Sequence, residues 1–428
     1  MIPLHGIATR EDLPLPFPLV VAAAAAVLVV TFWILLFAWR EPRYRRRTGR
    51  ELPRLGKFID SPAFSRPLRM AAGAVWLVAA VALALGADRI DNPVFGFVFV
   101  WLWVGLVPVA LLFGAVYRRT NPARLLLRLT GTTDAPARQN LDSRLPAALA
   151  LLVFLYAELV EPLSLTLPVL RGFAALWLAW ALLGTMATSR EWIERADPFE
   201  SFATTVAQLS PWSRSASGTL MIINPLRNLA AWQAPKHQTA LAVVLLSGTL
   251  FDAVAASAWW VKLTQASDIS PRVLGSLGLL GTVAVIGGLF LLCALPLRPP
   301  ERGLLPTADR LAPSLVPLIA GYFLAHYATM LYLEGQRTAI RFADPLGLGW
   351  DLFGLAESGP DTTLLAYPML VAVVQVLLIV GGHVAAALVC HDIALRGAHA
   401  ASAVLRQTPM LVFMVGLTIA GMLLMFGQ

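Results

Sequence analysis

Long apolar runs recur from one end of the chain to the other, and short polar or charged segments separate them. An α-helix needs roughly 20 consecutive apolar residues to cross the hydrocarbon core of a bilayer. Windows of that length predict an all-α, polytopic membrane bundle of about ten helices. The predicted spans are residues 17–39, 68–88, 94–117, 145–160, 169–188, 239–262, 274–297, 313–333, 366–390 and 409–427.

The charges between these runs predict the orientation of the bundle. With ten helices, most of the 33 lysine and arginine residues fall in the loops of one side. The positive-inside rule assigns that side to the cytoplasm and both termini to the outside. We therefore expect a multi-pass protein of an inner (plasma) membrane.

Composition supports the same class. Hydrophobic residues make up 58% of the 428 residues and charged residues only 14%, whereas soluble domains contain about 25% charged residues. The formal net charge of +8 is not arranged as a basic stripe interleaved with aromatic residues, so nucleic acid is not an expected partner. Cys293 and Cys390 both lie near predicted cytoplasmic helix ends, where a structural disulfide is not expected.

We expect residues 1–428 to form a single transmembrane domain with two long loops. Residues 189–238 form the predicted cytoplasmic loop between helices five and six. Within it, Asp197-Pro198-Phe199 predicts the start of a short helix whose apolar face lies on the membrane surface. Residues 334–366 form an outer loop rich in glycine, proline and aspartate, and a loop of this length is a candidate lid.

Four ionisable side chains interrupt the apolar runs: Glu158, Asp252, His326 and His383. A charged or imidazole group at bilayer depth is costly unless it is paired, hydrated or metal-bound, so each is a candidate functional residue. At about 1.5 Å per helical residue, the first three lie roughly 20 Å from the cytoplasmic boundary. By the same measure, His383 lies roughly 10 Å from it.

Two carboxylates and two imidazoles form a ligand set that suits zinc, iron or manganese. We expect His326, His383 and Asp252 to hold a divalent metal, with Glu158 as a fourth ligand or general base; Asp252 and Glu158 are the expected catalytic carboxylates. A purely structural interpretation of the same four residues also stays open. Glu158 would then be hydrated near the outer interface, Asp252 would cap a helix break, and the histidines would donate to backbone carbonyls.

The motifs of common soluble enzymes are absent: there is no P-loop, dinucleotide fingerprint, G-x-S-x-G elbow or H-E-x-x-H sequence. Several segments, in order along most of the chain, resemble a family of bacterial, mainly actinobacterial, polytopic membrane proteins labelled fenitrothion hydrolase. The similar segments are His5-Gly6-Ile7, Arg10 to Pro16, Asp197-Pro198-Phe199, Asn224 to Arg227, Phe251-Asp252, Asp344 to Gly354, Gly382-His383-Val384 and His391-Asp392.

The resemblance implies a phosphotriester hydrolase that cleaves aryl dialkyl phosphorothioates and releases a phenol. A metal-bound water would suit that reaction, and an uncharged, apolar substrate could enter laterally from the bilayer. A proton- or metal-coupled transporter, or an assembly factor for a metalloenzyme, is the alternative, because acids and histidines at mid-membrane also suit those roles. A third alternative is a structural partner of a second membrane subunit, with lipid as its other neighbour.

Overall fold

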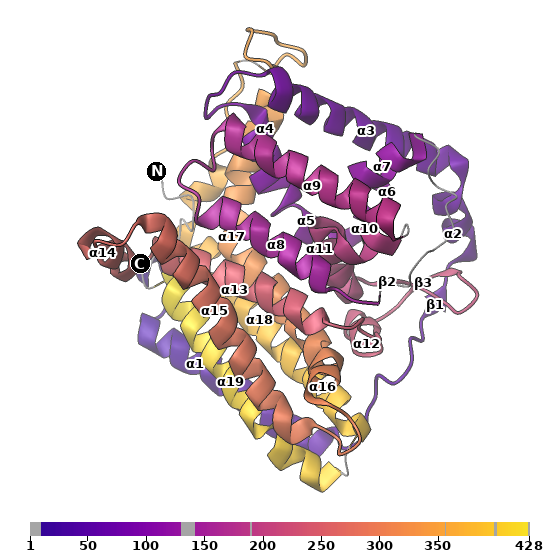
Figure 1. The fold of residues 1–428 in the computed structure, drawn as a ribbon. Helices are drawn as coiled ribbons and strands as arrows, with labels where there is room; N and C mark the ends of the chain where they lie inside the picture. Colours follow the sequence, from indigo (N-terminus) through magenta and orange to yellow (C-terminus); the bar gives the residue numbers. More distant parts are fainter. Residues whose placement is uncertain (1–9, 130–141, 189–190, 356, 398–399, 427–428) are drawn as a thin grey trace.

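Membrane-length helices dominate the structure, a computed structural model that describes residues 10–129, 142–188, 191–355, 357–397 and 400–426 (Figure 1). In this part of the chain, eight helices are long and apolar enough to cross a membrane. They are α1 (Phe17–Ala38), α3 (Pro62–Leu85), α9 (Leu167–Ala187), α13 (Gln238–Ala256), α15 (Pro271–Ala294), α17 (Leu315–Arg341), α18 (Pro368–Ala394) and α19 (Ala400–Phe426). The prediction of an all-α, multi-pass membrane bundle is confirmed.

The two remaining predicted spans are irregular. The third is α4 (Pro93–Gly96), the π-helical turn η2 (Phe97–Leu102) and α5 (Leu106–Phe113), and its two halves are bent by 45°. The fourth is α8 (Leu145–Leu159), an apolar helix of only 15 residues. A π-helical turn widens the backbone ring and commonly marks a bend, so hydropathy alone could locate this span but not its shape.

Shorter elements connect the spans. The helical ones are η1 (Arg10–Asp12), α2 (Pro53–Asp60), α6 (Tyr117–Thr120), α7 (Pro122–Leu129), α10 (Glu191–Ala196), α11 (Pro198–Val206), η4 (Ala207–Leu209), α12 (Pro225–Ala230), α14 (Ala258–Ala266), η5 (Leu295–Leu297), α16 (Leu304–Leu311), η6 (Ala312–Ser314), η7 (Thr363–Ala366) and η8 (Leu395–Gly397). Three short antiparallel strands, β1 (Arg50–Glu51), β2 (Trp212–Arg214) and β3 (Leu220–Ile222), form a sheet in the order β1-β3-β2.

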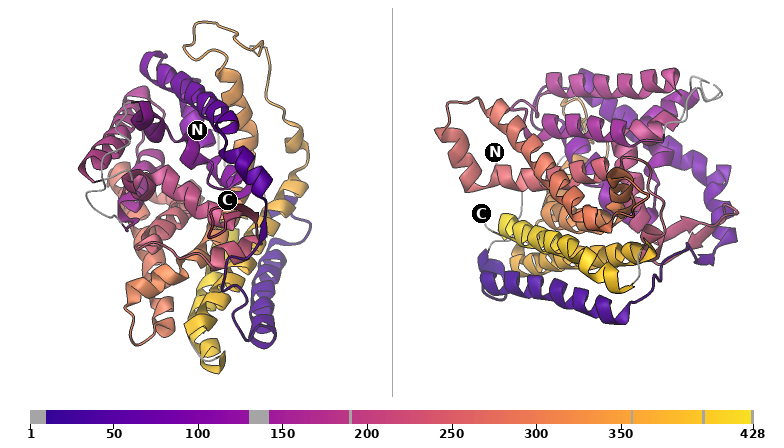
Figure 2. Two further views of the ribbon diagram at one scale, coloured as in Figure 1. Left: turned by 90° about the vertical axis from the view of Figure 1, so that its right-hand side faces the viewer. Right: turned by 60° about the horizontal axis from the view of Figure 1, so that its bottom comes forward.

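Helices α13 and α17 form the centre of the bundle, because most of their residues are buried within the protein. Helix α17 packs along α18, and α13 packs against α8, α15 and α17. By contrast, α1, α3, α9 and α15 bury only a minor part of their apolar surface. Figure 2 shows these helices at the periphery, where lipid is the natural neighbour of their exposed leucine and valine side chains.

The two ends of the described chain lie together. The Nε of Arg10 donates a hydrogen bond of 2.7 Å to the carbonyl oxygen of Phe426, and the rings of Phe17 and Phe426 are 6.3 Å apart. Both ends therefore lie on one side of the bundle, which an even number of crossings requires.

The segment between α9 and α13 is folded into the bundle. Helix α11 begins where Asp197 caps it, as the sequence predicts. Its aromatic face does not lie on the membrane surface: Phe199 packs edge-on to Phe154 of α8, and Phe202 packs on Trp103. The expected position on the membrane surface is wrong, because the apolar face of α11 packs against α5, α8 and α17. These helices bury the apolar face of an amphipathic helix more completely than lipid headgroups would.

Helix α17 extends past the predicted end of its span, to Arg341. Its last two turns are polar, so a hydropathy window does not include them in the predicted span. Tertiary contacts hold them instead: Trp101 donates a hydrogen bond of 3.0 Å to the carbonyl oxygen of Gly335, and Thr338 packs against Gly96. The outer loop that follows exposes Trp350 and Phe353, and its role as a lid stays a prediction.

Candidate functional site

Two of the four predicted intramembrane residues meet at the centre of the bundle. The Nε2 of His326, on α17, lies 3.2 Å from Oδ2 of Asp252 on α13. The hydroxyl of Tyr327 donates a hydrogen bond of 2.7 Å to the same oxygen. All three side chains are buried, with exposed fractions of 7% for Asp252, 3% for His326 and 2% for Tyr327. Asp252, His326 and Tyr327 are called the central triad below.

Aromatic packing fixes the imidazole of the central triad. Tyr322, one helical turn before His326, stacks on it with ring centroids 5.8 Å apart and an angle of 8° between the planes. Tyr327 packs edge-on to the same imidazole at 4.6 Å, and Phe323 packs on Tyr327 at 4.7 Å. Because two aromatic rings hold the imidazole, its contact with Asp252 is set before any ligand arrives.

The position of Asp252 depends on how α13 begins and ends. Asp309 of α16 accepts hydrogen bonds at 2.8 Å from the backbone N–H of His237 and at 2.9 Å from that of Thr239, which anchors the first turn. The helix ends at Ala256, and Ser257 caps α14 after the break. Asp252 is therefore not the cap of this break, and its carboxylate faces α17.

Glu158 lies beside the central triad. It is located on α8, which packs against α13, and it is close enough to Asp252 for the two carboxyl groups to interact electrostatically. Its Oε2 is buried and has no hydrogen-bond partner among the described residues. Two carboxylates repel each other strongly in a medium of low dielectric constant, and a proton or a cation between them relieves that repulsion.

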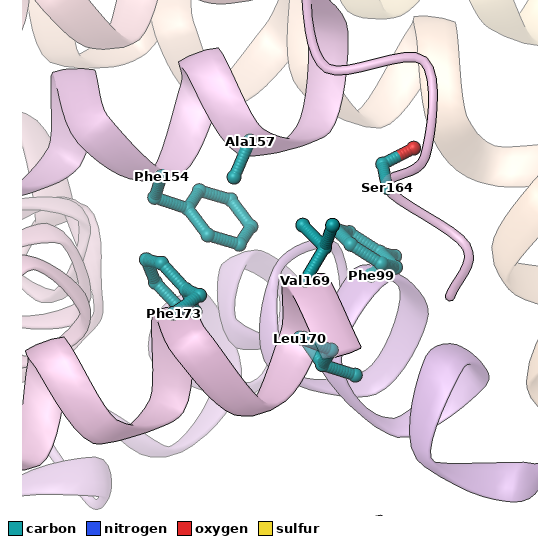
Figure 3. Close-up of a pocket in the computed structure, with 7 residues that line it drawn as sticks. All are labelled: Phe99, Phe154, Ala157, Ser164, Val169, Leu170 and Phe173. Carbon is teal, nitrogen blue, oxygen red and sulfur yellow. The ribbon is translucent and has the colours of Figure 1, made fainter. Parts of the chain in front are cut away.

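A small aromatic pocket includes Ala157, the residue before Glu158. Its other lining residues, shown in Figure 3, come from η2, α8, the loop after α8, and α9: Phe99, Phe154, Ser164, Val169, Leu170 and Phe173. Its volume is about 10 Å³, roughly the space of one water molecule. An aryl substrate would need these side chains to move apart.

His383 is separate from the central triad. Its Nδ1 lies 2.8 Å from the carbonyl oxygen of Ile379, one turn earlier in α18, and its buried Nε2 has no partner in the described part of the chain. Within that part, no three histidine, cysteine, aspartate or glutamate residues are grouped so that they could hold a metal ion. The predicted metal site therefore stays a prediction. Of its four expected ligands, His326 and Asp252 lie within 3.2 Å of each other.

The conspicuous His391-Asp392 pair has structural partners. Nδ1 of His391 lies 2.9 Å from the side-chain oxygen of Gln407, and its Nε2 lies 2.9 Å from the carbonyl oxygen of Trp39. Asp392 binds the segment after α1 and the guanidinium of Arg396. These contacts join α1, α18 and α19 at the arginine-rich end of the bundle and give both residues a structural role.

A second cluster of buried charged side chains lies outside the membrane spans, around the first turn of α11. Glu200 is fully buried and accepts hydrogen bonds from Arg124 at 2.7 and 2.5 Å and from Asn121 at 3.0 Å. Asp197 accepts hydrogen bonds from the backbone N–H of Glu200 and from Trp177. Burial, reinforced by the charge of Glu200, raises the pKa of Asp197 from its ordinary value to about 7.

Sequence reasoning did not find Tyr327, although it completes the site. A tyrosine in an apolar run is usually only part of the core, and nothing in the local sequence showed that its hydroxyl faces a carboxylate 75 residues away. Its position directly after His326 was the one available signal.

Comparisons with family models, with curated proteins and with solved structures found no match to this chain. The residues His5-Gly6-Ile7, which contribute to the family resemblance, lie outside the described part of the chain.

Proposed function

We propose that this chain is a membrane-embedded hydrolase of uncharged aryl phosphotriesters and aryl dialkyl phosphorothioates in a bacterial plasma membrane. The observation that carries the proposal is the buried contact between Asp252 and His326, with Tyr327 donating to the same carboxylate oxygen. The resemblance to fenitrothion hydrolases supplies the substrate class. A buried carboxylate that orients an imidazole is a common device for accepting a proton from a nucleophile.

In the proposed reaction, the Asp252–His326 pair accepts a proton from a water molecule. The resulting hydroxide forms a bond to phosphorus, and the bond between phosphorus and the aryl oxygen breaks. The leaving phenolate takes the proton back from the pair and departs as a phenol. Asp252 stabilises the positively charged imidazole while it holds the proton, and Tyr327 keeps the carboxylate in position.

An uncharged aryl ester partitions into lipid, so a site at bilayer depth gains substrate from the membrane. Exclusion of bulk water also strengthens the attraction between an imidazolium ion and its carboxylate. Both effects favour placing the central triad in a span and not in a loop.

The test is release of the nitrophenol from fenitrothion by membranes that contain equal amounts of each protein. His326→Gln and Asp252→Asn should lower the rate at least about 100-fold, because loss of a general base typically costs 10²–10⁴-fold. His383→Gln should retain the wild-type rate. Wild-type protein without activity, or His326→Gln with full activity, would overturn the proposal.

The same comparison tests the predicted metal site. If a metal held by His326, His383 and Asp252 activates the water, His383→Gln should lose activity together with the other two variants. Metal analysis of the purified protein should then show about one divalent ion per active chain, lost in all three variants. If only His326→Gln and Asp252→Asn lose activity, proton transfer is instead assigned to the Asp252–His326 pair alone.

A second candidate function is proton-coupled transport, which the position of Glu158 favours. Two carboxyl groups that interact at mid-membrane, with an adjacent imidazole, can exchange a proton between alternative states. The wild type should then carry protons in proteoliposomes, and Glu158→Gln should abolish this flux. Phenol release by the wild type without any proton flux would favour the hydrolase.

A further inference from the structure

An apolar groove lies between two spans, and no residue of the central triad lines it. It separates α15 from α19, which lie side by side in Figure 1, and its volume is about 670 Å³. Volumes of roughly 300–1,000 Å³ are typical of sites for small molecules. The lining side chains are Ile286, Leu289, Cys293, Pro409, Val412, Phe413, Leu417 and Ala420, with Thr408 and Gly416.

The groove extends to the arginine-rich end of the bundle. On α15, its last lining residue is Cys293, one position before the end of that helix. On α19, the groove begins at Thr408 and Pro409 and continues to Ala420. The thiol of Cys293 lies 3.2 Å from the carbonyl oxygen of Pro409, so α15 and α19 are in contact at this end of the groove.

Three arginines lie close in sequence to the residues that line this end of the groove. Arg406 precedes Pro409 by three residues, which is about 4.5 Å along a helix, and its side chain is exposed. Arg298 and Arg302 follow η5, which contacts α19, and both are exposed. Within the described residues, none of these three arginines pairs with a carboxylate, although Glu301 lies in the same segment.

We infer that this groove binds one anionic phospholipid of the arginine-rich leaflet. An acyl chain would fill the apolar groove, and the headgroup phosphate would contact Arg298 and Arg406. Phosphates pair well with guanidinium groups, and basic residues at a membrane surface attract anionic lipids. The inference goes beyond the proposed hydrolase and does not depend on it, because the groove and the central triad share no residue.

Gly416 allows the apolar part of the site to be tested by itself. A Cβ atom at this position would meet no other heavy atom within 4 Å, so a side chain can leave the helix there without a backbone clash. Gly416→Phe would therefore fill the groove where the acyl chain is expected. Gly281 on α15 is a matched control, because it is equally open and does not line the groove.

The experiment counts lipids that remain bound to the full-length protein. The protein is equilibrated in nanodiscs that contain equal amounts of dioleoyl phosphatidylglycerol and dioleoyl phosphatidylcholine, and is then released and analysed by native mass spectrometry. Wild-type protein should retain about one phosphatidylglycerol molecule per chain in preference to phosphatidylcholine. Since each surface arginine contributes about fivefold to anionic-lipid binding, Arg298→Gln/Arg406→Gln should lower retention roughly 25-fold.

Two controls make the outcome decisive. Arg50→Gln/Arg54→Gln removes the same charge from exposed positions on the same side of the bundle and should retain phosphatidylglycerol, as should Gly281→Phe. Gly416→Phe should lose it. Equal retention of phosphatidylcholine by the wild type, or unchanged phosphatidylglycerol in Gly416→Phe, would overturn the inference.

Discussion

Gly321 of α17 and Gly382 of α18 pack backbone to backbone. A Cβ atom at Gly382 would lie 2.6 Å from the carbonyl oxygen of Pro317 and 3.3 Å from Cα of Gly321. Small residues allow membrane helices to approach this closely. The crossing fixes how α17 is rotated within the bundle, and therefore the direction in which His326 projects five residues later.

Gly382→Ala should destabilise the protein by about 1–3 kcal/mol, because the added methyl group meets backbone atoms that cannot move away easily. Gly381 is the matched control, since a Cβ atom there meets no heavy atom within 4 Å. Gly381→Ala should be neutral or stabilise by up to about 1 kcal/mol, as alanine favours the helix. Thermal unfolding of the purified variants in one detergent measures both. Equal stability of the two variants would contradict a tight crossing.

Tyr327→Phe removes the hydrogen bond to Asp252 and preserves the aromatic packing. Because a hydrogen bond to a charged group contributes roughly 1.5–3 kcal/mol, we expect phenol release to fall about tenfold and stability to decrease. Tyr322 is the control: its buried hydroxyl has no partner among the described residues, so Tyr322→Phe should change neither quantity. Rates and unfolding temperatures of both variants check this. If the two variants lose activity equally, the contact with Asp252 does not matter for the reaction.

The sequence predicted the spans well because hydropathy averages over many residues. The same averaging cannot place features that depend on a single tertiary contact. The bend at Phe97–Leu102, the extra turns of α17 and the insertion of α11 all follow from neighbours that are distant in sequence.

The candidate site was predictable in part, for a similar reason. Counting residues along each helix gave Asp252 and His326 a common depth and separated His383 from them, and the structure joins the first two. Depth says nothing about rotation, so neither the role of Tyr327 nor the hydrogen bond of His383 to its own helix could be predicted.

Asp197 should make stability depend on pH. Its pKa rises from an ordinary 3.8 to about 7 in the folded protein, chiefly through burial. Between these values the folded state binds more protons than the unfolded state, so the free energy of unfolding falls as pH increases from about 4 to 7. Asp197→Asn retains a capping side chain and should remove this dependence. The difference in unfolding temperature between the two proteins, measured from pH 4.5 to 7.5, tests it, and a constant difference would contradict the assignment.

Asp392 should be the carboxylate whose loss most destabilises the arginine-rich end. It is fully buried, and its donors are Nε1 of Trp39 at 3.3 Å, the backbone N–H groups of Arg43 at 2.6 Å and Tyr44 at 3.0 Å, and Nη2 of Arg396 at 2.6 Å. Removing one partner of a buried ion pair typically costs 3–5 kcal/mol. Because Arg396 is partly exposed, we expect a loss of about 3 kcal/mol in Asp392→Asn.

Asp91→Asn provides the comparison for Asp392→Asn. It removes the same charge from an exposed pair with Arg89, and exposed pairs contribute about 0–1 kcal/mol. Thermal unfolding in detergent should therefore separate the two variants clearly, and phenol release by the folded fraction of each should match the wild type. A variant at Asp392 that stays fully stable but loses phenol release would contradict this structural role. It would indicate that the carboxylate takes part in the reaction.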